Sequence, residues 1–286
     1  MARGAILVTG GEGLLGRSLA ALSTADRPVV ALGRHELDIL DSEEIAAAID
    51  RFDPRVIVNA AALTDVDACE RDPAAAHRAN VEGPRLLALA CAARAVAFVH
   101  VSTDFVFDGI KRSPYTHLDP PNPISEYGKS KLEGERAVTA VLPEALIVRT
   151  SWVFGPGGKN FASRLVEYAS KSNTLKGITD MRSLPTYAPD LAARILELVE
   201  RGTPGTYHVV GSGEAASWLE VARFAVATAG LTGVTVEPVT ARELGLPAPR
   251  PEYSVMKCLL SERLGLPHLR DWHDAMTEFL RGDGVA

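Results

Sequence analysis

The sequence is poor in cysteine, has no excess of basic residues and contains no long hydrophobic run. Its three cysteines among 286 residues are too few and too widely spaced for a zinc site or a disulfide framework, so we expect ordinary thiols and no metal site. The formal net charge of -6 argues against a nucleic-acid partner and against a basic membrane-binding face. No segment reaches the ~20 apolar residues of a membrane span, and the first residues lack the pattern of a signal peptide. These absences favour a soluble, cytoplasmic protein.

Short apolar runs alternate with helical patterns over the first 155 or so residues. The runs are nearly continuous in apolar residues, as in strands that are buried on both faces. This alternation is typical of a doubly wound α/β fold of Rossmann type, in which the strands are parallel. We expect the strands at residues 5–10, 27–34, 54–62, 96–104 and 145–155.

The pattern changes after Gly155, and we place a domain boundary there. Residues 1–155 are expected to form an NAD(P)-binding domain. Residues 156–286 are expected to form a smaller substrate-binding lobe, some of whose elements rejoin the sheet. In this lobe we expect a loop and helix over 183–201, a strand over 205–211, a helix over 217–230, a mostly irregular stretch over 235–254 and a C-terminal helix.

The segment "TGGEGLLG", residues 9–16, lies between the first expected strand and helix. Its glycines, Gly10, Gly13 and Gly16, permit a tight turn and a close approach of the backbone to a pyrophosphate. The start of the next helix offers free N–H groups and a positive dipole end to the anion. A merely tight strand–helix turn is the alternative, but the strand–turn–helix context favours a dinucleotide site.

The residue after the second strand usually selects the dinucleotide, because an acid there bonds the ribose of NAD whereas an arginine accepts the 2′-phosphate of NADP. This chain has Gly33 and Arg34 at that point and no acid at the strand end. We therefore expect NADPH, with NADH as the alternative, although Arg34 is also compatible with an ordinary surface arginine. Asp38 is expected to hydrogen-bond the adenine region.

Tyr127 and Lys131 are four residues apart at the expected start of a helix, so their side chains share one face. A free phenol has a pKa of about 10, which is poorly matched to proton transfer near neutrality. A neighbouring ammonium favours the phenolate and is expected to lower that pKa. The pair would then suit the donation of a proton to a carbonyl oxygen, with Lys131 also bonding the cofactor ribose. The same spacing also arises by chance in many helices.

A hydroxyl at the end of the fourth strand would hold that carbonyl oxygen, and Ser102 and Thr103 lie there in "HVSTDFVFDG". They are also compatible with polar residues that merely cap a loop. Together with the glycine turn and the Tyr/Lys pair, in this order, they resemble the site of the short-chain dehydrogenases/reductases. Several placed elements carry more weight than any single motif.

The chain further resembles one branch of that group, the extended reductases typified by dTDP-4-dehydrorhamnose reductase. The resemblance spans nearly the whole chain and is carried by "STDFVFDG", "YGKSKLEGE", "RTSWVFGPGGKNF", "PTYAPDLA" and "PRPEYS" in the family's order. It implies reduction of the C4 ketone of a nucleotide-linked, dTDP-bound 4-keto-6-deoxysugar by NADPH or NADH. By the commonness of two-fold assemblies, a homodimer is the simplest expectation for its quaternary structure.

The resemblance also implies roles for individual residues. Thr103 would orient the ketone oxygen, Tyr127 would donate the proton, and Lys131 would tune Tyr127 and hold the ribose. Besides the glycines, Arg34 and Asp38, the cofactor would be contacted by Leu14, Ile39, Ala60, Ala61, Ala62 and Asn80. Besides Thr103, the substrate would be contacted by Asp104, Phe105, Val106, Trp152, Asn160 and Arg250, of which Trp152 could equally be plain core.

Three departures from the family pattern fall in or near the substrate region. Phe105 stands where the family commonly has tyrosine, which removes a hydroxyl near the sugar. The segment "DMRSLPT", residues 180–186, lacks the family's glutamine and glycine, and Lys257 stands where an aspartate is usual. Cofactor binding and reduction are therefore more firmly indicated than the identity of the sugar, and another dTDP-deoxysugar fits at least as well.

Two other functions are alternatives to a reductase. Proteins that resemble this family also serve as NADP-binding regulatory subunits of methionine adenosyltransferase, but nothing in this sequence disables the Tyr/Lys site. An epimerase or dehydratase of the same extended group is the second alternative. Dehydratases usually place acids beside the strand-end threonine. Here Asp104 follows Thr103, but the next residue is Phe105 instead of glutamate, which disfavours dehydration.

Overall fold

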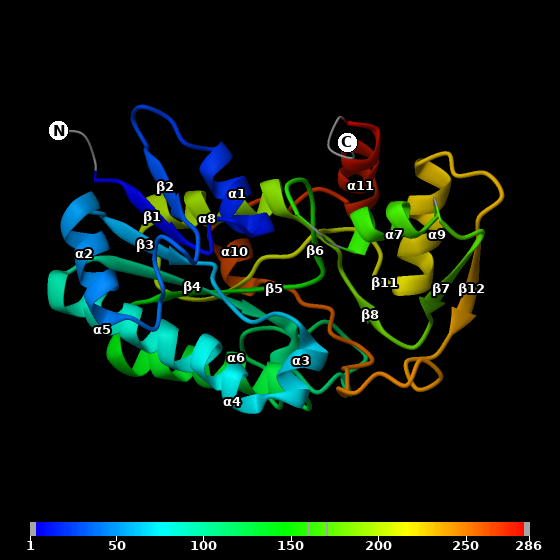
Figure 1. Ribbon diagram of the computed structural model, residues 1–286, viewed down its shortest axis with the longest axis horizontal. Helices are drawn as coiled ribbons and strands as arrows, with labels where there is room; N and C mark the ends of the chain where they lie inside the picture. The colour runs from blue at the N-terminus through cyan, green and yellow to red at the C-terminus, as the bar shows by residue number, and fades with distance from the viewer. Residues whose placement is uncertain (1–3, 159–160, 170, 283–286) are drawn as a thin grey trace.

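The computed structural model describes residues 4–158, 161–169 and 171–282. Its centre is a six-stranded parallel sheet in the order β10-β5-β4-β3-β1-β2 (Figure 1). The doubly wound parallel sheet predicted from the sequence is therefore confirmed. The strands are β1 (Ile6–Thr9), β2 (Val29–Leu32), β3 (Val56–Asn59), β4 (Ala97–Thr103), β5 (Leu146–Thr150) and β10 (Gly205–His208).

Helices cover both faces of this sheet. Ile6 and Val8 of β1 pack in a core with α1 (Leu14–Ala21) and α8 (Ala188–Arg201), whereas Leu7 packs in the core of the opposite face. The opposite face is covered by α2 (Ser42–Phe52), α5 (Gly83–Arg94) and α6 (Glu126–Val141). Successive strand residues thus enter different cores, which explains the nearly continuous apolar runs.

The connection after β3 is more helical than the sequence suggested. The expected polar loop contains α3 (Val66–Arg71) and α4 (Pro73–His77), whose first turns are capped by the side chains of Asp65 and Asp72. Helix α4 runs through a π-helical segment, η1 (Arg78–Glu82), into α5. Aspartate accepts hydrogen bonds from the free N–H groups of a helix start, so these two residues begin helices where only a loop was expected.

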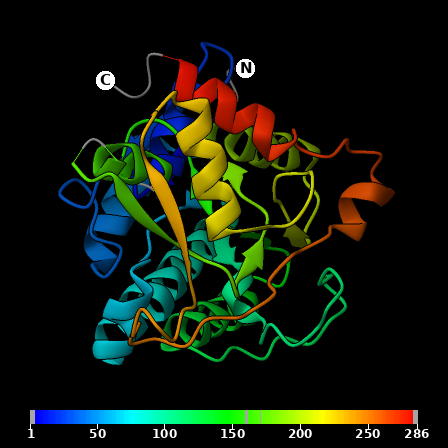
Figure 2. The same cartoon turned by 90° about the vertical axis from the view of Figure 1, so that its right-hand side faces the viewer.

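The second part of the chain is built from two-stranded sheets and short helices (Figures 1 and 2). Its pairs are β6 (Val153–Phe154) with β9 (Thr186–Tyr187), β8 (Arg182–Ser183) with β11 (Ala216–Ser217), and β7 (Thr174–Ile178) with β12 (Thr235–Val239). Its helices are α7 (Phe161–Ala169), α9 (Trp218–Thr228), α10 (Leu259–Arg263) and α11 (Trp272–Arg281). Of the elements beyond residue 155, α8 and β10 belong to the large sheet and its covering layer.

Two expectations about this part need correction. The stretch 235–254, expected to be mostly irregular, begins with strand β12, which pairs in parallel with the unpredicted strand β7. Pro238 lies within β12, and proline weakens a strand assignment from sequence although a two-stranded sheet tolerates it at an edge. The single strand expected over 145–155 is divided into β5 and β6, because Trp152 adopts a left-handed φ of 43° between them.

No helix within the described residues is long and apolar enough to cross a membrane.

Candidate active site

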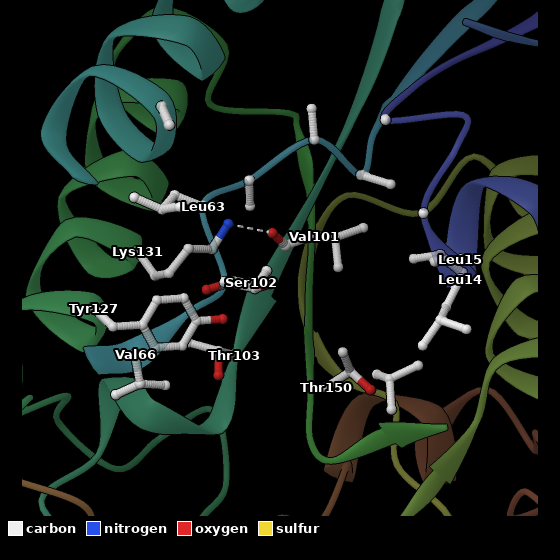
Figure 3. A pocket seen from close by; sticks show the side chains of 18 of the residues that line it. Leu14, Leu15, Leu63, Val66, Val101, Ser102, Thr103, Tyr127, Lys131 and Thr150 are labelled. Carbon is white, nitrogen blue, oxygen red and sulfur yellow. Dashed lines mark hydrogen bonds between the residues drawn. The ribbon is translucent and has the colours of Figure 1, made fainter. Parts of the chain in front are cut away.

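A cavity of about 990 Å³ opens at the carboxyl ends of β1, β3, β4 and β5, where the strand order reverses between β1 and β3. In open α/β sheets this position is the usual place for a ligand. The cavity extends from the glycine turn on one side to α6 on the other (Figure 3). Residues of the second lobe complete its wall. Nearly all of the predicted cofactor and catalytic residues line it.

At two positions, Gly10 and Gly16, the glycine turn has no room for a side chain. Gly10 has a φ of 71°, and a Cβ there would lie 2.8 Å from the backbone nitrogen of Ala61. A Cβ on Gly16 would lie 2.3 Å from the carbonyl oxygen of Gly10, so helix α1 packs directly against the turn. Helix α1 begins at Leu14 after Gly13, which has no side chain to cap its N–H groups. These N–H groups and the exposed backbone suit a pyrophosphate.

The wall next to the turn is formed by the loops after β2 and β3. Arg34, Asp38 and Ile39 line the cavity together with Ala60, Ala61 and Ala62, and all six are predicted cofactor contacts. The Asp38 carboxylate accepts a 2.9 Å hydrogen bond from the backbone N–H of Leu40, which shapes this loop. Exposed Arg34 and the small alanine side chains leave space for a phosphorylated ribose and a flat base. The residues present therefore fit a dinucleotide.

Tyr127 and Thr103 meet on the other side of the cavity (Figure 3). Thr103 ends β4, and Tyr127 lies in the first turn of α6, which is capped by Ser125. A Cβ on Gly128 would lie 2.2 Å from the carbonyl oxygen of Phe105, so this glycine allows α6 to approach the end of β4. Burial raises the pKa of Tyr127, and a hydrogen bond with Thr103 acts in the opposite direction.

Lys131 is almost completely buried beside Tyr127 on α6 (Figure 3). Its ammonium donates a 2.7 Å hydrogen bond to the carbonyl oxygen of Val101 in β4. Burial lowers the pKa of Lys131 to about 8, and the negative charge of Glu135 partly offsets this effect. The expectation that Lys131 lowers the pKa of Tyr127 is not met in this structure, because desolvation of the phenol dominates.

Asp104 joins the end of the large sheet to the second lobe. Its buried carboxylate accepts hydrogen bonds from the hydroxyls of Thr103 (3.1 Å), Ser183 (3.2 Å) and Ser254. Burial raises the pKa of Asp104 to about 6. The three hydroxyl hydrogen bonds lower this pKa, because they favour the charged form, but burial has the larger effect. Although Asp104 lines the cavity, its carboxylate is engaged with protein hydroxyls, which is a different arrangement from the substrate contact that the sequence suggested.

Other predicted residues lie elsewhere. The Asn80 side chain is buried and bonds the backbone of Leu63 at 2.9 and 3.0 Å and the hydroxyl of Ser130 at 3.0 Å. Asn80 is therefore placed to hold the loop after β3 against α6, and it is not among the residues that line the cavity. Val106 is fully buried in a core with Phe107 and Met256 and does not line the cavity either. Asn160 lies outside the described residues.

Arg250 lines the cavity, but its guanidinium is already engaged. It forms a 2.9 Å ion pair with Asp67 and donates a 2.8 Å hydrogen bond to the carbonyl oxygen of Ala248. The pair lowers the pKa of Asp67 against the opposing effect of burial. The predicted pyrophosphate contact would therefore have to compete with Asp67. Lys257, one of the departures from the family pattern, forms an ion pair with Glu262 and is not among the cavity-lining residues.

The second lobe contributes one residue, Trp218, that sequence reasoning had not placed in the site. Trp152, a predicted contact, stacks on Trp218 with ring centroids 3.7 Å apart and an interplanar angle of 11°. Both rings line the cavity, as does the buried side chain of Met181. Trp218 could be located at the start of a helix from the capping pattern Ser217–Glu220, but its contact with Trp152 depends on tertiary packing.

The described residues contain no group of three or more His, Cys, Asp or Glu that could hold a metal ion. Cys69 and Cys91 are buried free thiols, and burial raises the pKa of both; Cys258 is a half-buried free thiol.

A family model described as "RmlD substrate binding domain" matches residues 4–283. The chain is 39% identical over 274 residues to a dTDP-4-keto-6-deoxy-D-glucose reductase of Streptomyces niveus, covering 95% of each chain. It is also 39% identical to a dTDP-4-dehydrorhamnose reductase of Streptomyces griseus, covering 95% of this chain and 91% of that one.

Among solved structures, the fold is similar to that of a dTDP-4-dehydrorhamnose reductase of Bacillus anthracis in complex with NADP. The two superpose with a TM-score of 0.93 at 30% identity, covering 97% of this chain and 98% of the other.

Proposed function

Because this chain belongs to the family of the RmlD substrate binding domain, whose members include dTDP-4-dehydrorhamnose reductases, we propose that it reduces the C4 ketone of a dTDP-linked 4-keto-6-deoxysugar with NAD(P)H. One observation carries the proposal: Thr103 and Tyr127 meet in the same cavity as Lys131 and the glycine turn. An oxyanion site, a proton donor and a dinucleotide site are the three parts that such a reduction needs. Cytoplasmic location and a homodimer stay predictions.

The dinucleotide would be held along one side of the cavity. The N–H groups of the glycine turn and of the start of α1 would bind its pyrophosphate, and the wall of Ala60, Ala61 and Ala62 would contact its adenosine half. Arg34 would accept a 2′-phosphate, which favours NADPH over NADH. When bound, the nicotinamide supplies the hydride that adds to the ketone carbon.

The proton for the new alcohol comes from Tyr127. As the ketone carbon accepts the hydride, its oxygen takes the phenolic proton of Tyr127, so that a ketone becomes a secondary alcohol and Tyr127 becomes a phenolate. Thr103 lies beside Tyr127 and would orient the same oxygen. In this structure its hydroxyl donates to Asp104, so the proton would turn toward the ketone when the substrate binds. Burial keeps Tyr127 protonated until the transfer, because it raises the pKa of the phenol in the resting site.

Lys131 would balance the negative charge that proton transfer leaves on Tyr127. It lies one helical turn from Tyr127, and with a pKa of about 8 its ammonium is mostly charged at neutral pH. Its bond to the Val101 carbonyl anchors it to β4, and its other two N–H bonds are available for the cofactor ribose. A buried cation of this kind costs free energy in a resting protein, which is more easily understood for a working site than for a scaffold.

The variant Tyr127→Phe tests the proposal directly. It removes the proton donor and keeps the ring, so we expect kcat to fall by about a hundredfold or more. NADPH binding, measured by the fluorescence of the reduced nicotinamide, should change little. Reduction of dTDP-4-keto-6-deoxyglucose would be followed by the loss of nicotinamide absorbance. Full activity in the variant would contradict the role of Tyr127.

A regulatory subunit that binds NADP without turnover is disfavoured, because Thr103, Tyr127 and Lys131 are all present and assembled. It would be supported if wild-type protein bound NADPH tightly and consumed it with none of a panel of dTDP- and UDP-linked 4-keto sugars.

A further inference from the structure

Three buried ionisable side chains lie on one face of α6: Tyr127, Lys131 and Glu135. They are four residues apart, so each lies one helical turn from the next. Tyr127 and Lys131 line the cavity, whereas Glu135 is not among the residues that line it. The burial of Glu135 therefore has no explanation in a direct contact with a ligand in this cavity.

Glu135 forms a buried ion pair with Arg149 of β5. Its two carboxylate oxygens accept hydrogen bonds from Nε of the guanidinium at 2.9 Å and from Nη2 at 2.7 Å. The guanidinium also lies over the Phe107 ring, 5.3 Å from its centroid. Apolar residues of similar volume would join a helix to a strand at least as well, because two charges must leave water to form such a pair. A structural role alone therefore explains this pair poorly.

Lys131 is held beside this ion pair. Its ammonium donates a hydrogen bond to the carbonyl oxygen of Val101 in β4. Arg149 of β5 is the register partner of Ser102, which is the next residue of β4. Lys131 and Glu135 are also adjacent on the helix face. The helix spacing and the strand pairing therefore keep the ammonium and the ion pair in one buried cluster.

The charges of this cluster balance once Tyr127 has given its proton to the substrate. In the resting site the two cations, Lys131 and Arg149, outnumber the anion Glu135 by one. The Tyr127 phenolate supplies the missing negative charge. Among the described residues the other buried acidic side chain is Asp104, whose carboxylate is engaged with three hydroxyls. Without Glu135 two cations would share the buried cluster, and a neighbouring like charge favours the loss of a proton from a lysine.

Other titratable groups near Lys131 do not supply this negative charge. Cys69 of α3 and His100 of β4 are its further electrostatic neighbours. Burial raises the pKa of Cys69 to about 11 and lowers the pKa of His100 well below its usual value, so both are uncharged near neutrality. The charged side chains of α3, α4, η1 and α5, which also pack against α6, are exposed or half-buried and are screened by water: Asp67, Glu70, Arg71, His77, Arg78, Glu82, Arg85 and Arg94.

We propose, resting on the function proposed above, that Glu135 is a positioning residue of the reduction: its buried carboxylate, fixed by Arg149, keeps Lys131 charged. The charged ammonium is the form that donates hydrogen bonds to the cofactor ribose and stabilises the Tyr127 phenolate. Burial already lowers the pKa of Lys131 to about 8, so without the carboxylate much of the lysine would be neutral near pH 7. Glu135 thus acts on the reaction without touching the substrate or the cofactor.

The variant Glu135→Gln tests this inference, because it removes the charge and keeps a hydrogen-bond acceptor for Arg149. The titration of Lys131 is followed by NMR of protein labelled with carbon-13 at the lysine ε-carbon, and its signal is assigned with Lys131→Met. We expect the midpoint to fall by about one pH unit or more, which is the scale of the effect of a neighbouring opposite charge. Glu135→Asp, the matched control, keeps the charge and should keep the midpoint within about half a unit. An unchanged midpoint in Glu135→Gln would overturn the inference and leave the proposed function standing, since this titration needs no turnover.

The pH dependence of kcat is the second measurement. Reduction of dTDP-4-keto-6-deoxyglucose should slow on the alkaline side as Lys131 loses its proton, and in Glu135→Gln this fall should begin about one pH unit lower than in the wild type. At about pH 6, where Lys131 is charged in both proteins, the two kcat values should approach each other. A kcat reduced by the same factor at every pH would mean that the ion pair is merely structural and would overturn the inference. No turnover by the wild type at any pH would instead overturn the function proposed above, and with it the role of Glu135 in the reduction.

Arg149→Gln decides the matter if Glu135→Gln does not fold. It removes the cation beyond Glu135 and leaves the carboxylate to Lys131, so the midpoint of the Lys131 titration should rise by about half a unit or more. A midpoint that is unchanged or lower in Arg149→Gln would overturn the inference.

Discussion

The two sides of the cavity are built in different ways. On the cofactor side, the ligand surface is backbone and small side chains at the ends of long-range parallel strands. On the substrate side, it is large side chains next to short elements: Trp152 just before β6, Met181 just before β8, and Trp218, the first residue of α9. A backbone surface tolerates almost no change, whereas a wall of side chains can be altered one residue at a time. Substitutions on the substrate side can therefore change the specificity while the cofactor side stays the same.

Asp104 is where these two sides meet. Its carboxylate accepts hydrogen bonds from Thr103 of the proposed catalytic pair, from Ser183 of β8 and from Ser254 of the loop before α10. A disturbance in the second lobe can therefore reach Thr103, the group proposed to orient the ketone, through a single side chain.

The largest effect is expected from a variant that breaks only the cofactor side. In Gly16→Ala the new Cβ would lie 2.3 Å from the Gly10 carbonyl oxygen, so the turn must move. We expect NADPH binding to weaken by about a hundredfold, from an overpacking cost of about 2–3 kcal/mol. Binding is measured by nicotinamide fluorescence, with thermal unfolding to follow the fold. In the comparison variant Gly13→Ala the nearest contact is 3.3 Å, so its melting temperature should fall less than that of Gly16→Ala. Unchanged NADPH affinity in Gly16→Ala would refute the tight-turn argument.

A smaller effect is expected from a variant at the junction. Asp104→Asn loses the charge-assisted bonds to three hydroxyls, so we expect kcat to fall by about tenfold or more as Thr103 loses its orientation. Ser183→Ala removes only one of these bonds and should reduce kcat by about two- to fivefold. If kcat of Asp104→Asn stays within twofold of the wild-type value, Asp104 does not couple the second lobe to Thr103.

The wild type and Asp104→Asn can also be compared as a function of pH. The folded-state pKa of Asp104, about 6, lies above its ordinary value, so the folded protein binds this proton more readily than the unfolded chain. The stabilising contribution of this group is therefore present at low pH and is lost as the pH rises through about 6. Asp104→Asn lacks this contribution. As the pH falls from about 6 to about 4, we expect the melting temperature of the wild type to rise relative to that of the variant. A difference that does not change with pH would contradict the raised pKa of Asp104.

The smallest effect is expected at the rim of the cofactor side. Arg34 is exposed, so its loss should not disturb the fold. Arg34→Ala removes a partner for the 2′-phosphate of NADPH that NADH lacks, and the ratio of the two dissociation constants should shift by about tenfold toward NADH. Binding titrations with both cofactors measure this ratio. Equal weakening for both would mean that Arg34 does not choose between them.

The cofactor side could be predicted from the sequence because its signals are local. Gly10, Gly13 and Gly16 follow an apolar strand and open a helix, and Tyr127 and Lys131 are one helical turn apart. Because these groups are close in sequence, their positions relative to one another are set by local structure and do not depend on how the helices pack. The parallel sheet itself followed from the alternation of apolar runs with helical patterns.

The substrate side could not be predicted to the same degree, because its contacts join distant segments. The Trp152–Trp218 stack and the Asp104–Ser254 bond have no signal in the neighbouring sequence. Asn80 and Val106 show the opposite problem. Both belong to segments of the site, but packing turns Asn80 toward the Leu63 loop and Val106 into the core, which local sequence does not reveal.

The stacked indoles have an optical consequence. Two of the three tryptophans, Trp152 and Trp218, line the cavity, and the third, Trp272, is buried in the core of the second lobe. Reduced nicotinamide absorbs light in the range where tryptophan emits, so indole excitation should pass to a cofactor bound nearby. The tryptophans therefore serve as an intrinsic fluorescence donor. Binding and oxidation of the dinucleotide can be followed in real time from the tryptophan emission, without an added label.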